Sequence, residues 1–155
     1  MEKLLFFTLA FVSEIVGTMA GFGSSTIFLP LALFFVDFRS AIVLVAFFHL
    51  FGNIARVGFF KHDLNKEILR TFGIPSVLLS IIGAMTVGIL PQTLLKFALG
   101  IFLILFSLFS LFRPGFSFPT NKKSVALGGG ISGFLSGLIG TGGALRAAFL
   151  TGFHL

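Results

Sequence analysis

The sequence predicts an all-α protein that crosses a membrane several times. Hydrophobic residues make up 56% of its 155 residues, charged residues make up only 10%, and the mean hydropathy is +1.10. A soluble domain of this length could not cover so much apolar surface. The apolar residues also form long blocks, whereas the strands of a membrane β-barrel alternate over about ten residues. The composition therefore indicates membrane-spanning helices.

Charge and motifs narrow the function classes. The net charge of +6 does not indicate a nucleic-acid partner, because the basic residues lie mainly in short loops, where they orient membrane proteins. The absence of cysteine excludes disulfides and thiolate metal sites. The sequence has no phosphate-binding loop, no paired His-Glu metal motif and no nucleophile with a nearby base. We therefore expect no enzyme, metal or cofactor, and the lipid bilayer is the first expected partner.

The first apolar segment, residues 4–36, is too long for one upright crossing. It has about 33 residues, whereas a helix needs about 20 to cross the bilayer. Small residues at 17–26 interrupt it, which predicts two half-helices joined by a glycine-rich break. Residues 1–12 resemble a signal peptide, but Glu14 interrupts the expected cleavage region, so we expect the segment to be retained.

Three further spans and a second long segment follow. Blocks of apolar residues predict the spans at 40–60, 71–90 and 94–112. Short polar stretches separate them, at 37–39, 61–70 and 91–93. A loop at 113–123 then precedes a fifth apolar segment, residues 124–155, which glycines interrupt at 128–130 and 140–143.

The positions of Lys and Arg predict the orientation. If the first segment crosses once, seven basic residues lie on the side of Lys3, and only Arg39 and Lys96 lie on the other. Cytoplasmic loops are rich in basic residues, so this count places the N-terminus in the cytoplasm and the protein in the cytoplasmic membrane. A re-entrant hairpin would move Lys3 outside and change the counts to six and three. We predict a single broken crossing, with the hairpin as the alternative.

The fifth segment repeats the pattern of the first. Gly17 and Gly21 have the spacing of Gly133 and Gly137, and a second run of small residues follows after a three-residue insertion in the later copy. The alternative is that the two runs are unrelated helix-packing faces of small residues.

The repeat predicts the division of the chain. Residues 1–112 form a four-span repeat, residues 113–123 a cytoplasmic loop, and residues 124–155 the first, broken span of a second and incomplete repeat.

Several of these motifs together resemble the TauE/SafE (sulfite exporter, TSUP) family of membrane permeases. They are the break at 20–26 followed by Pro30, the pair Asn53 and Arg56, the stretch 72–76, and the stretch 140–146. The resemblance implies two four-span repeats, about eight spans in all, and transport of small anions such as sulfite and organosulfur compounds. The chain departs from it by ending at Leu155 and by having Phe149 where the first break has Pro30. A second copy or a missing C-terminal half is therefore an expected partner.

The breaks are candidate anion sites. A half-helix that begins near Ser24 has N–H groups without intrahelical partners and a positive dipole end. Gly23, Ser24, Ser25 and Thr26 would then bind substrate oxygens through N–H and hydroxyl groups. In the second break, substrate-binding roles are predicted for Gly142, Gly143 and Arg146. The alternative for both breaks is close helix packing through small residues.

The second span carries polar residues on one face. His49, Asn53 and Arg56 are spaced four and three residues apart. We expect Arg56 to attract the anion, Asn53 to donate a hydrogen bond and His49 to titrate with the transported proton. The alternatives are that Arg56 extends to the membrane interface and that His49 is a neutral hydrogen-bonding group.

Glu14 is the one acidic residue within the first apolar segment. A carboxylate in the membrane needs a proton or a cation beside it. Glu14 would either carry a coupled proton or form a static pair with Arg56 or Arg146.

The predicted function is transport of a small anion by alternating access between half-helix ends. The alternative from another class is a non-transporting membrane subunit, or an inactive fragment, that packs with a partner membrane protein. A remoter alternative is an intramembrane enzyme that uses Ser24 and His49.

Overall fold

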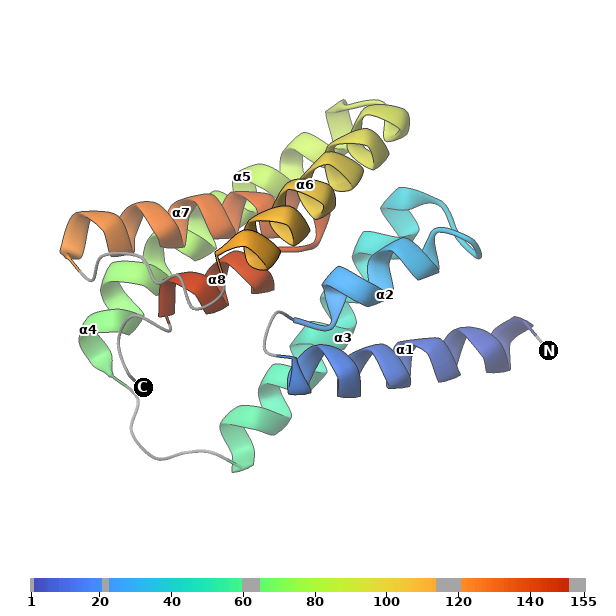
Figure 1. Ribbon diagram of the computed structural model, residues 1–155, viewed down its shortest axis with the longest axis horizontal. Helices are drawn as coiled ribbons and strands as arrows, with labels where there is room; N and C mark the ends of the chain where they lie inside the picture. The colour runs from blue at the N-terminus through green and yellow to red at the C-terminus, as the bar shows by residue number, and fades with distance from the viewer. Residues whose placement is uncertain (1, 21–22, 60–64, 114–120, 151–155) are drawn as a thin grey trace.

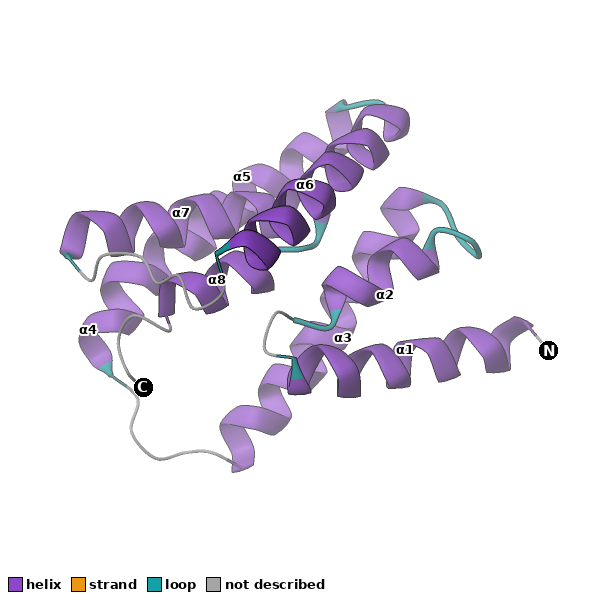
Figure 2. Ribbon diagram, viewed as in Figure 1, coloured by secondary structure: helices purple, strands orange, loops and turns teal. Residues whose placement is uncertain are grey.

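The computed structural model describes residues 2–20, 23–59, 65–113 and 121–150 (Figure 1). Throughout these residues the regular elements are helices, and none is a strand (Figure 2). The all-α fold predicted from the sequence is therefore confirmed. Within the described residues, two helical stretches are long and apolar enough to cross a membrane, Lys66–Ile89 and Gln92–Phe112, and two shorter apolar stretches are Leu4–Met19 and Phe38–Ile54.

The first segment is a helical hairpin. Helices α1 (Glu2–Met19) and α2 (Ser25–Ala32) fold back on each other, and the Phe6 ring lies 5.4 Å from the Phe28 ring and 5.7 Å from the Phe35 ring, between centroids. In a single helical crossing, residues 6 and 35 would lie about 40 Å apart. The prediction of one broken crossing was therefore wrong, and the alternative hairpin is correct.

Two glycines explain why the segment turns back. A Cβ on Gly17 would lie only 2.3 Å from the Ser24 Cα, so only glycine allows the two arms to approach this closely. Gly23 has a φ of 92°, which glycine adopts without strain, and its N–H donates to the Gly17 carbonyl at 3.3 Å. The count of basic residues could not detect this geometry, because it changed by only one residue between the two alternatives.

Helix α3 (Phe38–Phe59) begins at a strong cap. Asp37 Oδ1 accepts hydrogen bonds from the Arg39 and Ser40 N–H groups at 3.0 and 3.2 Å, and Oδ2 accepts one from the Ser40 hydroxyl. The hydroxyl and N–H of Ser40 hold the pKa of Asp37 below its ordinary value. Phe38 N–H also donates to Gln92 Oε1 at 3.1 Å, which places the start of α3 beside the start of α6 (Gln92–Phe112).

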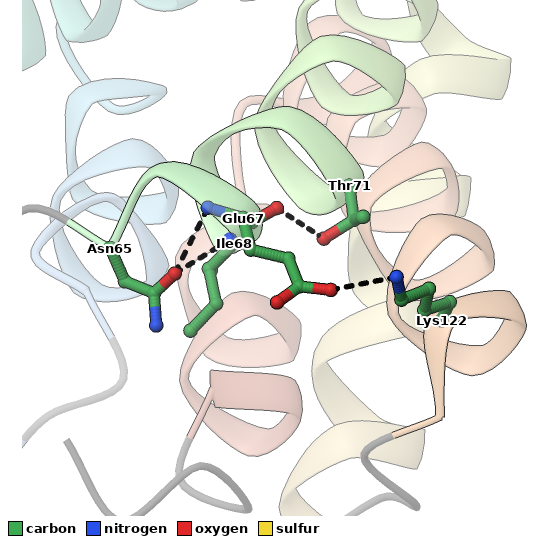
Figure 3. Close-up of polar contacts among 5 residues, drawn as sticks. All are labelled: Asn65, Glu67, Ile68, Thr71 and Lys122. Atoms are coloured by element: carbon green, nitrogen blue, oxygen red, sulfur yellow. Dashed lines mark hydrogen bonds and ion pairs between the residues drawn. The ribbon is translucent and has the colours of Figure 1, made fainter.

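The third span begins earlier than predicted. Helix α4 (Lys66–Ile68) follows directly on the cap residue Asn65, whose side chain accepts from the Glu67 and Ile68 N–H groups (Figure 3). A π-helical turn, η1 (Leu69–Gly73), then leads into α5 (Ile74–Ile89). Pro75 has no N–H to donate, and the wider π turn before it lets the chain continue as a helix. Residues 65–70, predicted as loop, are therefore cap and helix, while 60–64 lie outside the described residues.

Helix α7 (Lys122–Ile139) packs against α5 through small residues (Figure 1). At three α7 glycines, a Cβ would lie 2.0–2.3 Å from a carbonyl oxygen of η1 or α5: Gly129 at Phe72, Gly133 at Ser76 and Gly137 at Ser80. Backbone contact this close requires glycine. The alternative interpretation of Gly133 and Gly137 as a packing face is therefore correct for these two residues.

The chain ends in a second hairpin. Helix α8 (Gly143–Leu150) turns back along α7, so that the Phe149 ring covers Gly128 and packs with Phe72 and Val125. Gly140 makes the turn with a φ of 71°. Like the first hairpin, this one has a helix of 18 residues followed by a helix of 8.

The alignment of the two copies differs from the prediction. The connection between the hairpin helices spans residues 20–24 in the first copy and only 140–142 in the second. The insertion expected in the second copy is therefore absent. Gly17 faces its own hairpin partner while Gly133 faces α5, so the two glycines are not equivalent. The division into repeats at 112 and 124 stays a prediction.

The core lies where the hairpin arms meet the long helices. Leu29 of α2, Phe38 of α3, Leu95 of α6 (Gln92–Phe112) and Ile139 of α7 are almost fully buried within one apolar cluster. This cluster holds the two hairpin tips beside the middle of α3.

Candidate functional site: a cavity between the two hairpin tips

A cavity of about 310 Å³ lies between the tips of the two hairpins. Its wall comes from three parts of the chain that are far apart in sequence. The lining residues are Gly23 and Ser24 at the start of α2, Val45, Ala46, His49 and Asn53 of α3, and Ser136, Gly140, Gly143 and Arg146 of the second hairpin.

The first hairpin presents a helix N-terminus to this cavity. Ser24 is the N-cap of α2, yet its hydroxyl makes no capping hydrogen bond. The N–H groups of Thr26 and Ile27 already bond to the Gly23 and Ser24 carbonyls, at 3.3 and 3.1 Å. Among the described residues, the donors left at this end are the hydroxyls and the N–H groups of Ser24 and Ser25. They lie at the positive end of the α2 helix dipole.

The second hairpin presents another helix N-terminus. Gly140 and Gly143 line the cavity, and α8 begins there, close to the start of α2 (Figure 1). Arg146, in the first turn of α8, is the one charged side chain on the described wall, apart from the titratable His49. Its side chain keeps surface that is open to the cavity. Two positive helix ends and a guanidinium therefore converge on one space.

Helix α3 closes the wall with two polar side chains. His49 and Asn53, one helical turn apart, both line the cavity as the spacing predicted. The third residue of that face, Arg56, has a side chain outside the described part of the structure, so its anion-binding role stays a prediction.

Four residues with predicted site roles lie elsewhere. Gly142 packs against α7, where a Cβ would lie 2.3 Å from the Ser132 carbonyl. Thr26 faces a separate hollow with Ser107 and Ser110 of α6. Glu14 and Ser25 line a much smaller cavity behind the Ser24 and His49 wall.

The sequence interpretation missed four lining residues. Val45 and Ala46 supply apolar wall and carry no chemical signal. Ser136 and Gly140 did carry a signal in the sequence. A glycine that ends a helix marks the turn, and the serine one helical turn before it faces the same side of the helix. Gly140 N–H donates to the Ser136 carbonyl at 3.0 Å, which fixes this relation.

The chemistry of the wall suits an anion. It combines a guanidinium, a hydroxyl from each hairpin, an amide and two positive helix ends, and the described lining includes no carboxylate. Among the described residues, no three His, Asp or Glu side chains lie close enough together to bind a metal ion.

Comparison with known proteins finds one family match. The family model described as "Sulfite exporter TauE/SafE" matches residues 5–155, nearly the whole chain. No curated protein and no solved structure matches the chain.

Proposed function

The chain belongs to the sulfite exporter TauE/SafE family, a family of membrane permeases, and on this premise we propose that it moves a small oxyanion through the cavity between its hairpin tips. The substrate class is sulfite, a sulfonate or a related organosulfur anion. The protein acts as a permease of the cytoplasmic membrane and catalyses no reaction.

One observation carries the proposal. The N-termini of α2 and α8 and the side chain of Arg146 meet at a single cavity without a carboxylate on its described wall. Each helix end is equivalent to roughly half a positive charge, so an anion there gains favourable interactions from both hairpins. An Arg side chain also matches the geometry of oxyanions with two parallel hydrogen bonds.

The size of the cavity suits a small substrate. At about 310 Å³ it lies at the lower end of the range for small-molecule sites, roughly 300–1,000 Å³. Ser24, Asn53 and Ser136 supply hydrogen bonds to the remaining oxygens. Gly23 and Gly143 allow the backbone to approach the anion closely.

Alternating access follows from unequal packing. The glycine contacts lock α5 and α7 together, so α5, α7 and α8 move as one body. The first hairpin and α3 form the other side of the cavity. Relative movement of these two bodies opens the cavity first to one side of the membrane and then to the other.

Glu14 and His49 carry the coupled proton in this proposal. His49 lines both the large cavity and the small one that contains Glu14, so it connects the substrate site to a carboxylate. Titration of His near neutral pH makes it suited to taking up and releasing a proton during transport.

The hairpin changes the proposed orientation. Residues 2–3, 37–39 and 88–92 share one end of the molecule, because Phe6 contacts Phe35 and Arg39 donates to the Gly88 carbonyl. With the hairpin, the count of basic residues in the sequence is three at this end (Lys3, Arg39 and Lys96) and six at the other. We therefore propose that the end with six basic residues lies in the cytoplasm and the N-terminus outside.

Cysteine labelling tests this orientation directly, because the chain has no native cysteine. Single cysteines at Lys3 and Lys122 are exposed to a membrane-impermeant maleimide in intact cells. The proposal expects labelling of Lys3→Cys and protection of Lys122→Cys until the cells are opened. The reverse labelling pattern would indicate that the N-terminus lies in the cytoplasm.

The function is tested by sulfite flux in proteoliposomes. Loss of a hydrogen bond to a charged group costs about 1.5–3 kcal/mol, so Arg146→Gln should lower flux at low sulfite concentration roughly tenfold to a hundredfold. Lys96→Gln removes an exposed cation of α6 away from the cavity and serves as the control. Absence of flux from the wild-type protein, with partner binding intact, would favour the non-transporting subunit. Turnover that depends on Ser24 would favour the enzyme.

A further inference from the structure

A second, very small cavity lies directly behind the wall of the large one. Its volume is about 10 Å³, which is close to the minimum for one water molecule, about 10–15 Å³. Its polar lining consists of Glu14 of α1, Ser24 and Ser25 of α2, and His49 of α3. Ser24 and His49 belong to both cavities, so these two side chains form the partition between them.

Ser25 indicates that this space is occupied. Its side chain is only 2% exposed, and its hydroxyl oxygen has no hydrogen-bond partner among the described residues. A buried hydroxyl without a partner is unfavourable, and native proteins usually satisfy such a group with an ordered water. A water needs two to four polar partners, and the lining offers four candidate side chains.

The surrounding charges favour water over a cation. The small cavity lies at the positive N-terminal end of α2, and Arg146 of α8 lines the adjoining cavity. The titratable or charged groups that face this region are Glu14 from α1, His49 from α3 and Arg146 from α8, while α2 and α7 contribute only hydroxyls. A site with this balance does not attract a sodium ion.

We propose that the small cavity holds one water molecule, fixed by the Ser25 hydroxyl, that passes the coupled proton between His49 and Glu14. The proton leaves a ring nitrogen of protonated His49 and joins the water oxygen, while a second proton of that water joins a Glu14 carboxylate oxygen. One N–H bond breaks, one O–H bond forms, and the water is regenerated. Ser25 is thus a positioning residue for proton transfer instead of a substrate ligand. This inference rests on the proposed anion transport.

Two assays on the full chain in proteoliposomes separate the roles. The first measures exchange of labelled sulfite at equal pH on both sides, which needs no net proton movement. The second measures sulfite accumulation driven by a pH gradient. The outside pH is held constant and only the inside pH is varied, so the protonation of external sulfite does not change.

The variants are Ser25→Ala and Thr141→Val. Thr141 is a matched control, because it is also a fully buried hydroxyl without a described partner, at the other hairpin tip and outside both cavities. For Ser25→Ala we expect exchange within about twofold of wild type, accumulation about tenfold lower, and a changed dependence on inside pH. Thr141→Val should match wild type in both assays.

Each outcome decides one question. Accumulation by Ser25→Ala equal to that of Thr141→Val would overturn the water relay, and so would loss of exchange together with accumulation. If sulfite accumulation required sodium ions, the small cavity would be assigned to a cation and not to a water. Absence of sulfite exchange in the wild-type protein would contradict the proposed function itself.

Discussion

The two hairpins have the same shape and different surroundings. Each has an 18-residue helix, a turn with a positive-φ glycine and an 8-residue helix that begins at the cavity. Helix α7 is held along its length by backbone contacts to α5. Helix α1 instead leaves large apolar side chains uncovered, including Leu4, Phe7, Phe11 and Met19, which are 63–84% exposed.

This difference suggests a division of labour between them. The second hairpin is locked to its neighbour and carries the guanidinium, so it provides a rigid anion site. The first hairpin is held mainly by its own arms and by α3, and it carries the carboxylate and two serines. It is therefore the part of the molecule that can shift when protonation changes. The following substitutions test the contrast.

The largest effect is expected at the locked hairpin. In Gly133→Leu, the new Cβ would lie 2.1 Å from the Ser76 carbonyl oxygen, with no flexible side chain to move aside. Separation of α5 and α7 should destabilise the protein by about 3 kcal/mol or more. Thermal unfolding in detergent, followed by fluorescence-detected size exclusion, measures the loss.

Gly100→Ala is the matched control, because a Cβ there meets nothing within 4 Å. It should be neutral or stabilise α6 by roughly 0.5–1 kcal/mol. Equal stability of Gly133→Leu and wild type would mean that α7 is not locked to α5.

A smaller effect on stability and a larger one on function are expected at the first hairpin. In Gly17→Ala, the new Cβ would approach the Ser24 Cα to 2.3 Å and push the start of α2 away from α1. The uncovered surface of α1 leaves room for that movement, so the cost should be about 1–3 kcal/mol. Sulfite flux should fall because Ser24 leaves the cavity wall.

Gly58→Ala in α3 is the comparison for this variant, since a Cβ at Gly58 has open space around it. Normal flux in Gly17→Ala would show that the position of Ser24 is not critical for transport.

Much of this site could be predicted from sequence because its polar residues stand out in an apolar chain. Gly23, Ser24, His49, Asn53, Gly143 and Arg146 were all expected, and all line the cavity. Their chemistry and their spacing along each helix gave the signal.

The remaining features depend on contacts between distant parts of the chain. Direct contact of Phe6 with Phe35 decides between a hairpin and a single crossing, and no local pattern encodes it. Ser24 and Ser25 are adjacent serines, and both line the small cavity, yet only Ser24 also lines the large one. Small residues alone also do not distinguish a turn from a packing face, as Gly17 and Gly133 demonstrate.

A modest effect is expected at the cap of α3. Asp37 is hydrogen-bonded by Ser40 and Arg39, whereas Ser24 makes no capping bond, so only the first of these caps should contribute through its side chain. Asp37→Ala should lower the unfolding temperature at pH 7, and Asp37→Asn should restore most of it.

The pH dependence of this cap follows from the lowered pKa of Asp37. The stabilisation is complete above the unfolded-state pKa and is lost as the pH falls through the lower folded-state value. The Asp37→Ala difference should therefore be constant from pH 5 to 8 and shrink only below about pH 4. A difference that changes near neutral pH would assign the titration to another group.

The smallest effect is expected at the ion pair that joins α4 to α7. Glu67 Oε1 and Lys122 Nζ lie 2.9 Å apart (Figure 3), but the two side chains are 64% and 80% exposed. Exposed pairs contribute about 0–1 kcal/mol, so Glu67→Gln should scarcely change thermal stability, and less still at high salt. The result bears on the contrast between the hairpins, because it asks what holds α7 in place. A loss comparable to that of Gly133→Leu would show that charge, and not the close backbone packing of the glycines, fixes the second hairpin.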